Sequence, residues 1–317
     1  MKLSRLVVVG CAMVALSTCV SEEIAVDSFV IATGQHFTTS APVVTWQHDE
    51  GYDGHRETCW FRDDVLPIKP APGCNTRRRY SARRARGEKA AKAVAESGWT
   101  LDLLRERVDQ IVLHYDACGC SKKCFEVLHD RRGLSCHFLL DVDGTIYQTL
   151  DLTARGRHAT IANDRSIGVE IANIGAYGQR SALDRWYVRT PAGDVKMRFP
   201  EELGDPGLRT PGFVARPARS NLIRGRVNGH DLMQYDFTDA QYASLAKLVR
   251  TLAGVFPKIR LAVPRDAAGR VREGMLPRAE FDAFTGVLGH SHVQKNKTDP
   301  GPAFDWERLL REAAHRP

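Results

Sequence analysis

The feature that most constrains the fold is a short apolar run, Ile111-Val112-Leu113, followed directly by His114. A continuous run of this length is typical of a strand that is buried on both faces. A second apolar run, 286–289, also ends in a histidine, His290. Both patterns indicate a sheet that lies inside the domain, with helices on either side.

Strand and helix patterns alternate between these two runs. Further strands are predicted at 137–140, 145–150 and 166–173. Residues 121–129 predict a helix. Thr238 and Gln241 form a capping box ahead of apolar residues at helical spacing that continue to Pro257, and 305–313 predicts a closing helix. We therefore expect an α/β fold in which a single mixed central β-sheet is flanked by helices.

The distribution of turn-forming residues and periodic apolar residues divides the chain into regions. Residues 20–107 contain turn formers and few periodic apolar stretches, which predicts an irregular N-terminal extension that ends in a basic linker. Residues 108–315 are expected to form the packed domain. Within it, residues 179–230 are rich in Arg, Pro and Gly, so we expect a long surface insertion there rather than a second core.

The first residues have the pattern of an export signal. Lys2 and Arg5 precede an apolar run, 6–16, that is too short to span a bilayer comfortably, so residues 1–19 are predicted to be a signal peptide. The run ends in Leu-Ser-Thr-Cys, which resembles the lipobox of bacterial lipoproteins. Lipidation of Cys19 would anchor the protein to the membrane, whereas simple cleavage would release it. We expect a periplasmic or outer-membrane-anchored protein, with secretion as the alternative.

The positive charge of the chain favours anionic partners. The formal net charge is +7 and the pI is near 9.0. Six arginines cluster at Arg77, Arg78, Arg79, Arg83, Arg84 and Arg86. Two interpretations stay open: the cluster binds an anionic polymer, or it is part of a solvated linker that continues into a helix at 88–96. The export signal argues against a nucleic-acid partner, and only one aromatic residue, Tyr80, stands among these arginines.

Cysteine usage fits export to an oxidising compartment. The chain has eight cysteines, of which Cys11 and Cys19 belong to the signal region. The other six are Cys59, Cys74, Cys118, Cys120, Cys124 and Cys136. The close spacing of Cys118, Cys120 and Cys124 would also suit a metal site, but paired CxxC spacing is missing, so disulfides are the favoured prediction.

Two strand-end histidines and a nearby carboxylate suggest a metal centre. Asp299 follows His290 by nine residues. Two histidines with one carboxylate are a common ligand set for catalytic zinc, which keeps its fourth position for water. Zinc lowers the pKa of that water and polarises a carbonyl group, which makes amide hydrolysis possible at neutral pH. The spacing by itself is a weak signal.

Three separated segments make the signal specific. They are IVLHYDACG at 111–119, SCHFLLDVDGTIYQTLDL at 135–152 continuing through NDRSIGVEIANIG at 163–175, and GHSHVQKNKTDPGPAFDW at 289–306. Together they resemble the zinc-dependent N-acetylmuramoyl-L-alanine amidases of the type-2 class. That superfamily also includes phage lysozyme-amidases and the peptidoglycan recognition proteins of animals. The resemblance covers most of residues 108–312 outside the insertion.

The resemblance implies a role for each matching residue. His114, His290 and Asp299 would bind one catalytic Zn²⁺. Glu170 would take a proton from the attacking water and pass it to the leaving amine. Lys297 would stabilise the oxyanion. The segment between His290 and Lys297 departs from the family pattern, because it is one residue shorter and lacks a Pro-Gly.

Other polar residues near these segments receive weaker assignments. His158 stands in Arg-His-Ala-Thr where many relatives have Trp-His-Ala-Gly, and it is a candidate for substrate binding, as is Asn163. His292 is interpreted as a loop residue or a partner behind the ligands, and His129 and His137 are assigned to structure.

The resemblance also suggests disulfide pairs. Cys118 and Cys124 match the position of a short disulfide in peptidoglycan recognition proteins. Cys59–Cys74 and Cys120–Cys136 are then the pairs left over.

The predicted function is hydrolysis of the amide bond between N-acetylmuramic acid and L-alanine in peptidoglycan or muropeptides, by a monomeric enzyme. The alternative is a recognition module that binds peptidoglycan without cutting it, because several superfamily members have lost a zinc ligand. The presence of all three ligands together with Glu170 and Lys297 favours the enzyme. The sequence leaves open whether the substrate is intact wall or released anhydro-muropeptides.

Overall fold

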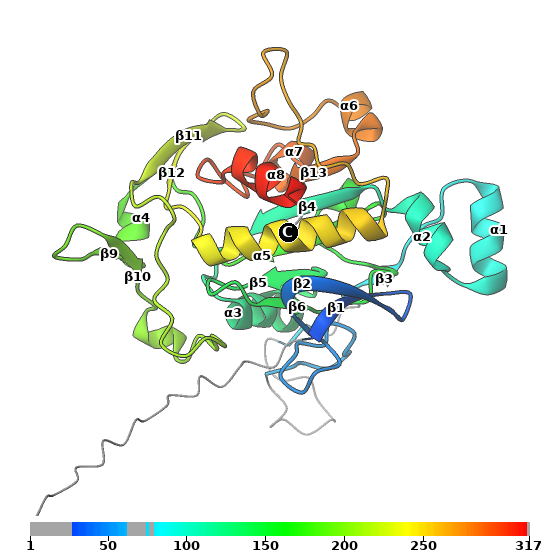
Figure 1. Ribbon diagram of the computed structural model, residues 1–317, viewed down its shortest axis with the longest axis horizontal. Coiled ribbons are helices and arrows are strands. Elements are labelled where there is room, and N and C mark those ends of the chain that lie inside the picture. The colour runs from blue at the N-terminus through cyan, green and yellow to red at the C-terminus, as the bar shows by residue number, and fades with distance from the viewer. Residues whose placement is uncertain (1–26, 62–73, 76–78, 316–317) are drawn as a thin grey trace, which may run out of the picture.

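The structure is a computed structural model that describes residues 27–61, 74–75 and 79–315. In this part of the chain, seven strands form one sheet in the order β1-β2-β6-β5-β8-β4-β13, with helices on both sides (Figure 1). The predicted mixed α/β fold is therefore confirmed. The predicted signal peptide and Cys19 lie outside the described residues. No helix within the described ranges is long and apolar enough to cross a bilayer.

The strands predicted from the apolar runs form the middle of the sheet. β4 (Gln110–Tyr115) lies between β8 (Ser166–Ile171) and β13 (Gly286–Gly289) and is parallel to both. β5 (Phe138–Leu140) is parallel to β8, and β6 (Ile146–Gln148) returns antiparallel to β5. Parallel strands that are covered on both faces need apolar side chains throughout, which explains the continuous runs.

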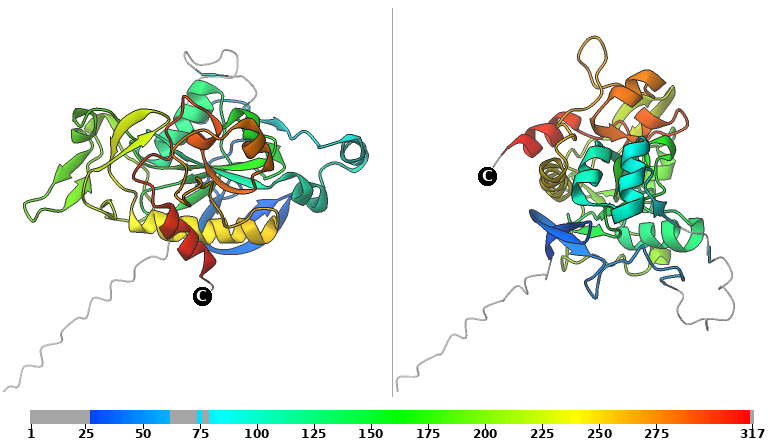
Figure 2. Two further views of the ribbon diagram at one scale, coloured as in Figure 1. Left: turned by 90° about the horizontal axis from the view of Figure 1, so that it is seen from above. Right: turned by 90° about the vertical axis from the view of Figure 1, so that its right-hand side faces the viewer.

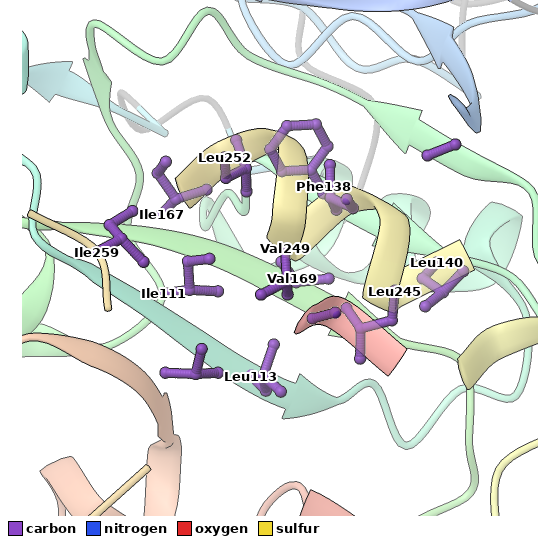
Figure 3. Packing of buried hydrophobic residues seen from close by; sticks show 14 of the residues in the cluster. Ile111, Leu113, Phe138, Leu140, Ile167, Val169, Leu245, Val249, Leu252 and Ile259 are labelled. Carbon is purple, nitrogen blue, oxygen red and sulfur yellow. The ribbon is translucent and has the colours of Figure 1, made fainter. Parts of the chain in front are cut away.

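Helix α5 (Asp239–Val255) covers one face of the sheet. Its predicted capping box is present, because the Thr238 hydroxyl accepts from the Gln241 backbone N–H at 3.1 Å and the Gln241 side chain accepts from the Thr238 N–H at 2.9 Å. Leu245, Val249 and Leu252 point from α5 into the core formed by the sheet residues (Figure 3).

Two further helical segments complete the layers. α8 (Trp306–Ala314) begins after its N-cap Asp305 and lies beside α5 on the same face (Figure 2). α3 (Ser121–Phe125) and its π-helical continuation η1 (Glu126–Arg132) lie on the opposite face. The helix predicted at 121–129 is present in these two segments. The sheet is thus enclosed between helices, as the buried strand patterns require.

Two N-terminal strands correct the expectation of an irregular extension. β1 (Asp27–Ala32) and β2 (Gln35–Thr45) form an antiparallel pair, and β2 joins the main sheet parallel to β6. Val30 and Val43 are fully buried in the core of the domain. The apolar run Phe29-Val30-Ile31-Ala32 in β1 is comparable in length with the run before His114, but turn formers surround it, so the composition of the region predicted irregular structure.

The basic linker divides into buried and exposed arginines. The Arg83 guanidinium donates to the backbone carbonyls of Leu152 at 3.0 Å, Asn163 at 3.1 Å and Ser166 at 3.0 Å. Arg79 is also buried and donates to backbone carbonyls, with 2.7 Å to His129. These two arginines therefore hold the fold together, which neither interpretation of the cluster anticipated. Arg84 and Arg86 are exposed, and Arg77 and Arg78 lie outside the described residues.

Two helices follow the linker. They are α1 (Glu88–Ser97), which has no buried residue, and α2 (Leu101–Arg107), whose N-cap hydroxyl is that of Thr100. Both project from one end of the sheet (Figure 1). A short bridge between β3 (Ser81–Ala82) and β7 (Ala154–Arg155) ties the linker to the domain.

The region predicted to be a surface insertion contains regular elements and a small hydrophobic cluster of its own. Leu183, Tyr187 and Val195 pack with Ala172 and Ile174 from the end of β8. The elements are α4 (Ser181–Asp184), β9 (Tyr187–Arg189), β10 (Val195–Met197), η3 (Glu201–Leu203), β11 (Ile223–Val227) and β12 (His230–Gln234). The region thus contains more packed structure than its composition predicted. The remaining elements are η2 (Thr160–Ala162), α6 (Arg278–Ala283) and α7 (His290–Val293).

One of the three expected disulfides is present. Cys59 and Cys74 are bonded. The other two expected pairs, Cys118–Cys124 and Cys120–Cys136, are wrong, because these four thiols are free in the structure. Cys124 and Cys136 pack as small apolar groups among aromatic side chains on the α3 face of the sheet, and burial raises the pKa of both thiols. Cys120 instead begins the first turn of α3.

Candidate active site

The alternation of side chains along β4 decides which face of the sheet carries the site. Ile111 and Leu113 point to the α5 core, so His114 points to the opposite face. Glu170 of β8 is the direct register partner of His114, and partners in neighbouring strands project to the same face. One imidazole and one carboxyl group are thus placed side by side on the face away from α5.

The three predicted metal ligands converge on one point. His290 is the first residue of α7, directly after β13, and Asp299 lies on the segment that follows. The His114 Nδ1 atom lies 3.0 Å from Nδ1 of His290 and 2.8 Å from Oδ2 of Asp299. The His290 Nδ1 atom lies 3.0 Å from the same Asp299 oxygen, and all three residues are buried. The shorter segment after His290 has therefore not separated the ligand atoms.

The Nε2 atoms of His114 and His290, which face away from the shared point, each lie within hydrogen-bond distance of an acceptor. Nε2 of His290 lies 2.6 Å from Oε1 of Gln294. Nε2 of His114 lies 3.0 Å from Nδ1 of His158, whose own Nε2 lies 3.4 Å from the Ser166 hydroxyl. The arrangement that satisfies these contacts puts the proton of each ligand histidine on Nε2. The Nδ1 lone pairs are then directed toward the shared point, as metal binding requires.

The protonation states also suit a divalent cation. Burial, followed by the neighbouring His290, lowers the pKa of His114 to about 4, so its imidazole is neutral at pH 7. Burial opposes ionisation of Asp299, but the close contacts of its carboxylate with His114 and His290 outweigh it and hold the Asp299 pKa below its ordinary value. Two imidazoles and a carboxylate are a ligand set typical of catalytic Zn²⁺, so the residues present fit this ion.

Glu170 and Lys297 complete the polar face. Glu170 is buried, and burial followed by repulsion from Asp299 and Asp116 raises its pKa well above the ordinary value. The positive charge of Lys297, which is half-buried, acts in the opposite direction on the Glu170 pKa. Lys297 therefore lies close enough to influence the protonation of Glu170.

The two candidate substrate-binding residues form one local unit. The Asn163 side-chain oxygen accepts from the backbone N–H of His158 at 3.2 Å and of Ala159 at 2.7 Å, which fixes the loop that carries His158. The His158 ring lies behind His114, where a Cβ on Gly168 would come within 2.7 Å of it and of the Cys136 sulfur. The His158 ring hydrogen-bonds with His114 and Ser166 and packs edge-to-face against the ring of His137.

The other histidines near the site bond to backbone groups. His292 accepts from the Gly289 N–H at 2.9 Å, and its Nε2 lies 2.7 Å from the carbonyl of Arg272. It is a residue of α7 rather than of a loop, and it is not among the converging ligands. His137 accepts from the Gly168 N–H at 3.0 Å, and Nε2 of His129 lies 3.0 Å from a carbonyl oxygen.

Sequence reasoning missed Gln294. It follows His290 by four residues, one helical turn, and it contacts the outer nitrogen of that ligand. The only available signal was this spacing, because the segment after His290 was read as a loop. A second missed residue is Asn228, whose side-chain amide donates to the carbonyl of Lys297 at 2.6 Å. Its Asn-Gly dipeptide is a hairpin signal inside the region predicted to be a surface insertion.

Comparison with known families decides the assignment. The sequence profile of the family described as N-acetylmuramoyl-L-alanine amidase matches residues 104–302, which is more than half of the chain. The chain belongs to the N-acetylmuramoyl-L-alanine amidase family. The matched span contains the three converging ligands together with Glu170 and Lys297.

Individual amidases match over shorter stretches. The chain is 33% identical over 84 residues to the 1,6-anhydro-N-acetylmuramyl-L-alanine amidase AmpD of Enterobacter cloacae, and equally to AmpD of Salmonella typhimurium strain SL1344. Each alignment covers 26% of this chain. It covers 31% of the length of the curated relative, so the chain spans about a third of the relatives it matches.

Solved amidase structures show a distant likeness. A crystal structure of a selenomethionine derivative of AmpD is 18% identical, with a TM-score of 0.33, and the alignment covers 66% of this chain and 87% of that one. The AmiD amidase from E. coli, solved in complex with anhydro-N-acetylmuramic acid-L-Ala-D-γ-Glu-L-Lys, is also 18% identical, with a TM-score of 0.36 and coverage of 65% and 57%.

Proposed function

We propose that this protein hydrolyses the amide bond between N-acetylmuramic acid and L-alanine in peptidoglycan or muropeptides. Family membership supports the reaction class. The observation that carries the proposal is the convergence of the His114, His290 and Asp299 ligand atoms beside Glu170 on one face of the sheet. These three atoms would hold one Zn²⁺ ion.

Each polar residue then has a chemical task. A bound zinc ion supplies Lewis-acid polarisation of the scissile carbonyl and lowers the pKa of water. Glu170 removes a proton from the water as its oxygen bonds to the carbonyl carbon. It returns that proton to the alanine nitrogen as the C–N bond breaks, so one group acts as base and then as acid. Its raised pKa favours such proton uptake.

Lys297 provides fixed positive charge. As the carbonyl oxygen becomes an oxyanion, a preorganised cation beside it lowers the energy of the tetrahedral intermediate. The effect is large where water is excluded, and the neighbouring ligand residues are buried. His158 and Asn163 are proposed to contact substrate near the metal.

We further propose that the protein acts as an exported monomer, periplasmic or anchored to the outer membrane through Cys19, with secretion as the alternative. The signal-like pattern at 1–19 supports export. The Cys59–Cys74 disulfide supports an oxidising compartment.

The test is release of L-alanine-terminated stem peptide from purified muropeptides by full-length protein of known zinc content. We expect chelation to abolish release and added zinc to restore it. Glu170→Gln should keep zinc and lose about 10²- to 10⁴-fold in turnover, because its proton transfers are lost. His114→Ala should lose the metal. His230→Ala, which alters an exposed histidine, should behave as the wild type.

Two results would count against the proposal. Binding of muropeptide without cleavage by the zinc-loaded protein would make it a recognition module. Full turnover by Glu170→Gln would remove this residue from the mechanism.

A further inference from the structure

The hairpin of β11 and β12 reaches the segment that carries the metal ligands. Val227 and His230 are the last paired residues, so the turn between them consists of Asn228 and Gly229 alone. Both turn residues have positive φ, 49° and 87°, which a two-residue hairpin turn of this kind requires and which Asn-Gly adopts readily. This turn directs the Asn228 side chain toward residues 291–298, which connect His290 to Asp299. We name them the ligand loop, although residues 291–293 are the end of α7.

Asn228 binds the ligand loop at three places. Its side-chain amide donates to the carbonyl oxygens of Ser291 at 3.0 Å, Gln294 at 3.2 Å and Lys297 at 2.6 Å. The two amide protons are shared among three acceptors, which come from the beginning, the middle and the end of the loop. One side chain outside the loop thus connects the residue after a ligand with the residue proposed to stabilise the oxyanion.

The other groups of Asn228 are fixed as well. Its side-chain oxygen accepts from the backbone N–H of Met275 at 2.8 Å, and its own N–H donates to the carbonyl of Glu273 at 3.1 Å. A Cβ on Gly274 would lie 2.8 Å from that side-chain oxygen, so the absence of a side chain there makes room for the amide. The orientation of Asn228 is therefore determined from two sides.

The two ends of the ligand loop are restrained independently of Asn228: the Leu276 N–H donates to the His292 carbonyl at 2.9 Å, and the hydroxyls of Thr298 and Tyr115 lie 2.6 Å apart. Lys295 and Asn296 at its centre are exposed. Within the loop, the Lys297 N–H donates to the Gln294 carbonyl at 3.2 Å, and the loop is closed at its base by the Ser291 N–H on the Asp299 carbonyl at 3.0 Å. Asn228 adds contacts to the backbone carbonyls of Gln294 and Lys297, on either side of the exposed centre of the loop.

We propose that Asn228 is a positioning residue of the active site: its amide holds the ligand loop so that His290, Asp299 and Lys297 keep their places. This inference rests on the proposed function for its catalytic consequence. It also gives the inserted region a role, because the hairpin that ends the region delivers this contact. Residues that orient metal ligands from behind typically change metal affinity or activity by about 10- to 100-fold when they are altered.

Four variants of the full-length protein test the proposal. Asn228→Asp keeps the shape but replaces the donor by a carboxylate that faces three carbonyl oxygens. Asn228→Gly removes the amide and tolerates the positive φ. Gly274→Ala leaves Asn228 in the chain but displaces its side chain. Asp231→Asn, an exposed change in the same hairpin, is the control.

We expect the first three variants to bind zinc about 10- to 100-fold more weakly in competition with a chelator. At saturating zinc, their kcat should fall with little change in KM, because Lys297 rather than substrate binding is affected. In the metal-free proteins, the amides of 291–298 should exchange hydrogen faster than in the wild type, while exchange in β4 and β8 stays unchanged. The control should match the wild type in all three measurements.

Hydrogen exchange in the metal-free state separates this inference from the proposed function. Unchanged exchange of the ligand loop in Asn228→Asp and Asn228→Gly would overturn the positioning role, whatever the activity. If the wild type neither binds zinc nor cleaves muropeptide, the proposed function fails, yet faster loop exchange in the variants would still support the positioning role. Full zinc affinity and turnover in both Asn228 variants would contradict it.

Discussion

Nδ1 of His158 lies 3.0 Å from Nε2 of His114, on the side of the ring opposite the converging ligand atoms. The His158 ring fits there because Gly168 has no side chain, and Asn163 fixes the backbone that carries it. His114 is thus held from both sides of its ring. This contact gives His158 a role that differs from substrate binding and can be tested against it.

Replacing His158 by Ala removes the acceptor behind His114. If the contact orients the ligand, zinc affinity should fall about 10- to 100-fold, and turnover at saturating zinc should recover in large part. If His158 instead binds substrate, KM should rise with zinc affinity unchanged. Chelator competition and steady-state kinetics on the same preparation distinguish the two results, and the exposed His230→Ala serves as the reference.

Replacing Lys297 by Met keeps the length of the side chain but removes its charge. The expected loss in kcat is about 10²- to 10³-fold, the usual effect of removing one stabilising group from an oxyanion. KM and zinc content should change little, since Lys297 is not a ligand. Lys295→Met, two residues earlier and exposed, should retain full activity. Equal kcat values in the two variants would show that charge at position 297 is dispensable.

Arg83→Met should destabilise the fold strongly. Its guanidinium donates to three backbone carbonyls, and burial lowers its own pKa to about 9, so the site is already costly for a cation. Unpaired buried acceptors cost about 1–3 kcal/mol each, so a net loss of about 3 kcal/mol is expected in denaturant unfolding. Arg84→Met, at the exposed neighbouring position, should change stability by less than about 0.5 kcal/mol.

His137 should make the protein sensitive to acid. Burial, followed by the nearby Arg83, lowers the His137 pKa from 6.5 to about 3. The folded state thus favours neutral imidazole, so this contribution to stability is complete above pH 6.5 and is lost as the pH falls from 6.5 toward 3. For one such group the loss between pH 7 and pH 5 is about 2 kcal/mol.

The effect of His137 is isolated by comparison with His137→Asn, both proteins being treated with chelator. The variant should be less stable at pH 7, but its free energy of unfolding should decline by about 2 kcal/mol less than that of the wild type between pH 7 and pH 5. Parallel pH profiles would show that His137 does not control acid stability.

The sequence predicted the parts of this fold whose patterns are local. The apolar run before His114 and the capping box at Thr238 each lie within a few neighbouring residues, and both are present. The strands β1 and β2 were missed because each is stabilised by its partners rather than by its own pattern. Arg83 was misread for the same reason, since a buried arginine among exposed ones differs from them only in its three-dimensional surroundings.

The residues of the site were predicted from the resemblance to the type-2 amidases, because sequence spacing alone does not show that such distant residues lie together. His114 and His290 are 176 positions apart, and only the parallel pairing of β4 and β13 brings them together. The groups that orient them could not be predicted, because Gln294, His158 and Asn228 act through contacts made only after folding. The Cys59–Cys74 disulfide was assigned correctly, but the other two pairs were not, because proximity in sequence does not show which thiols the fold brings together.

The position of β13 at the edge of the sheet has a thermodynamic consequence. β4 is the only neighbour of this strand in the described sheet, so the ion that His114 and His290 would share links an edge strand to the interior. The unfolded chain has no such site, and binding that is restricted to the folded state stabilises it in proportion to the logarithm of ligand concentration. Free zinc at a hundred times its Kd would add about 2.7 kcal/mol. Metal supply would then set the lifetime of the protein as well as its turnover.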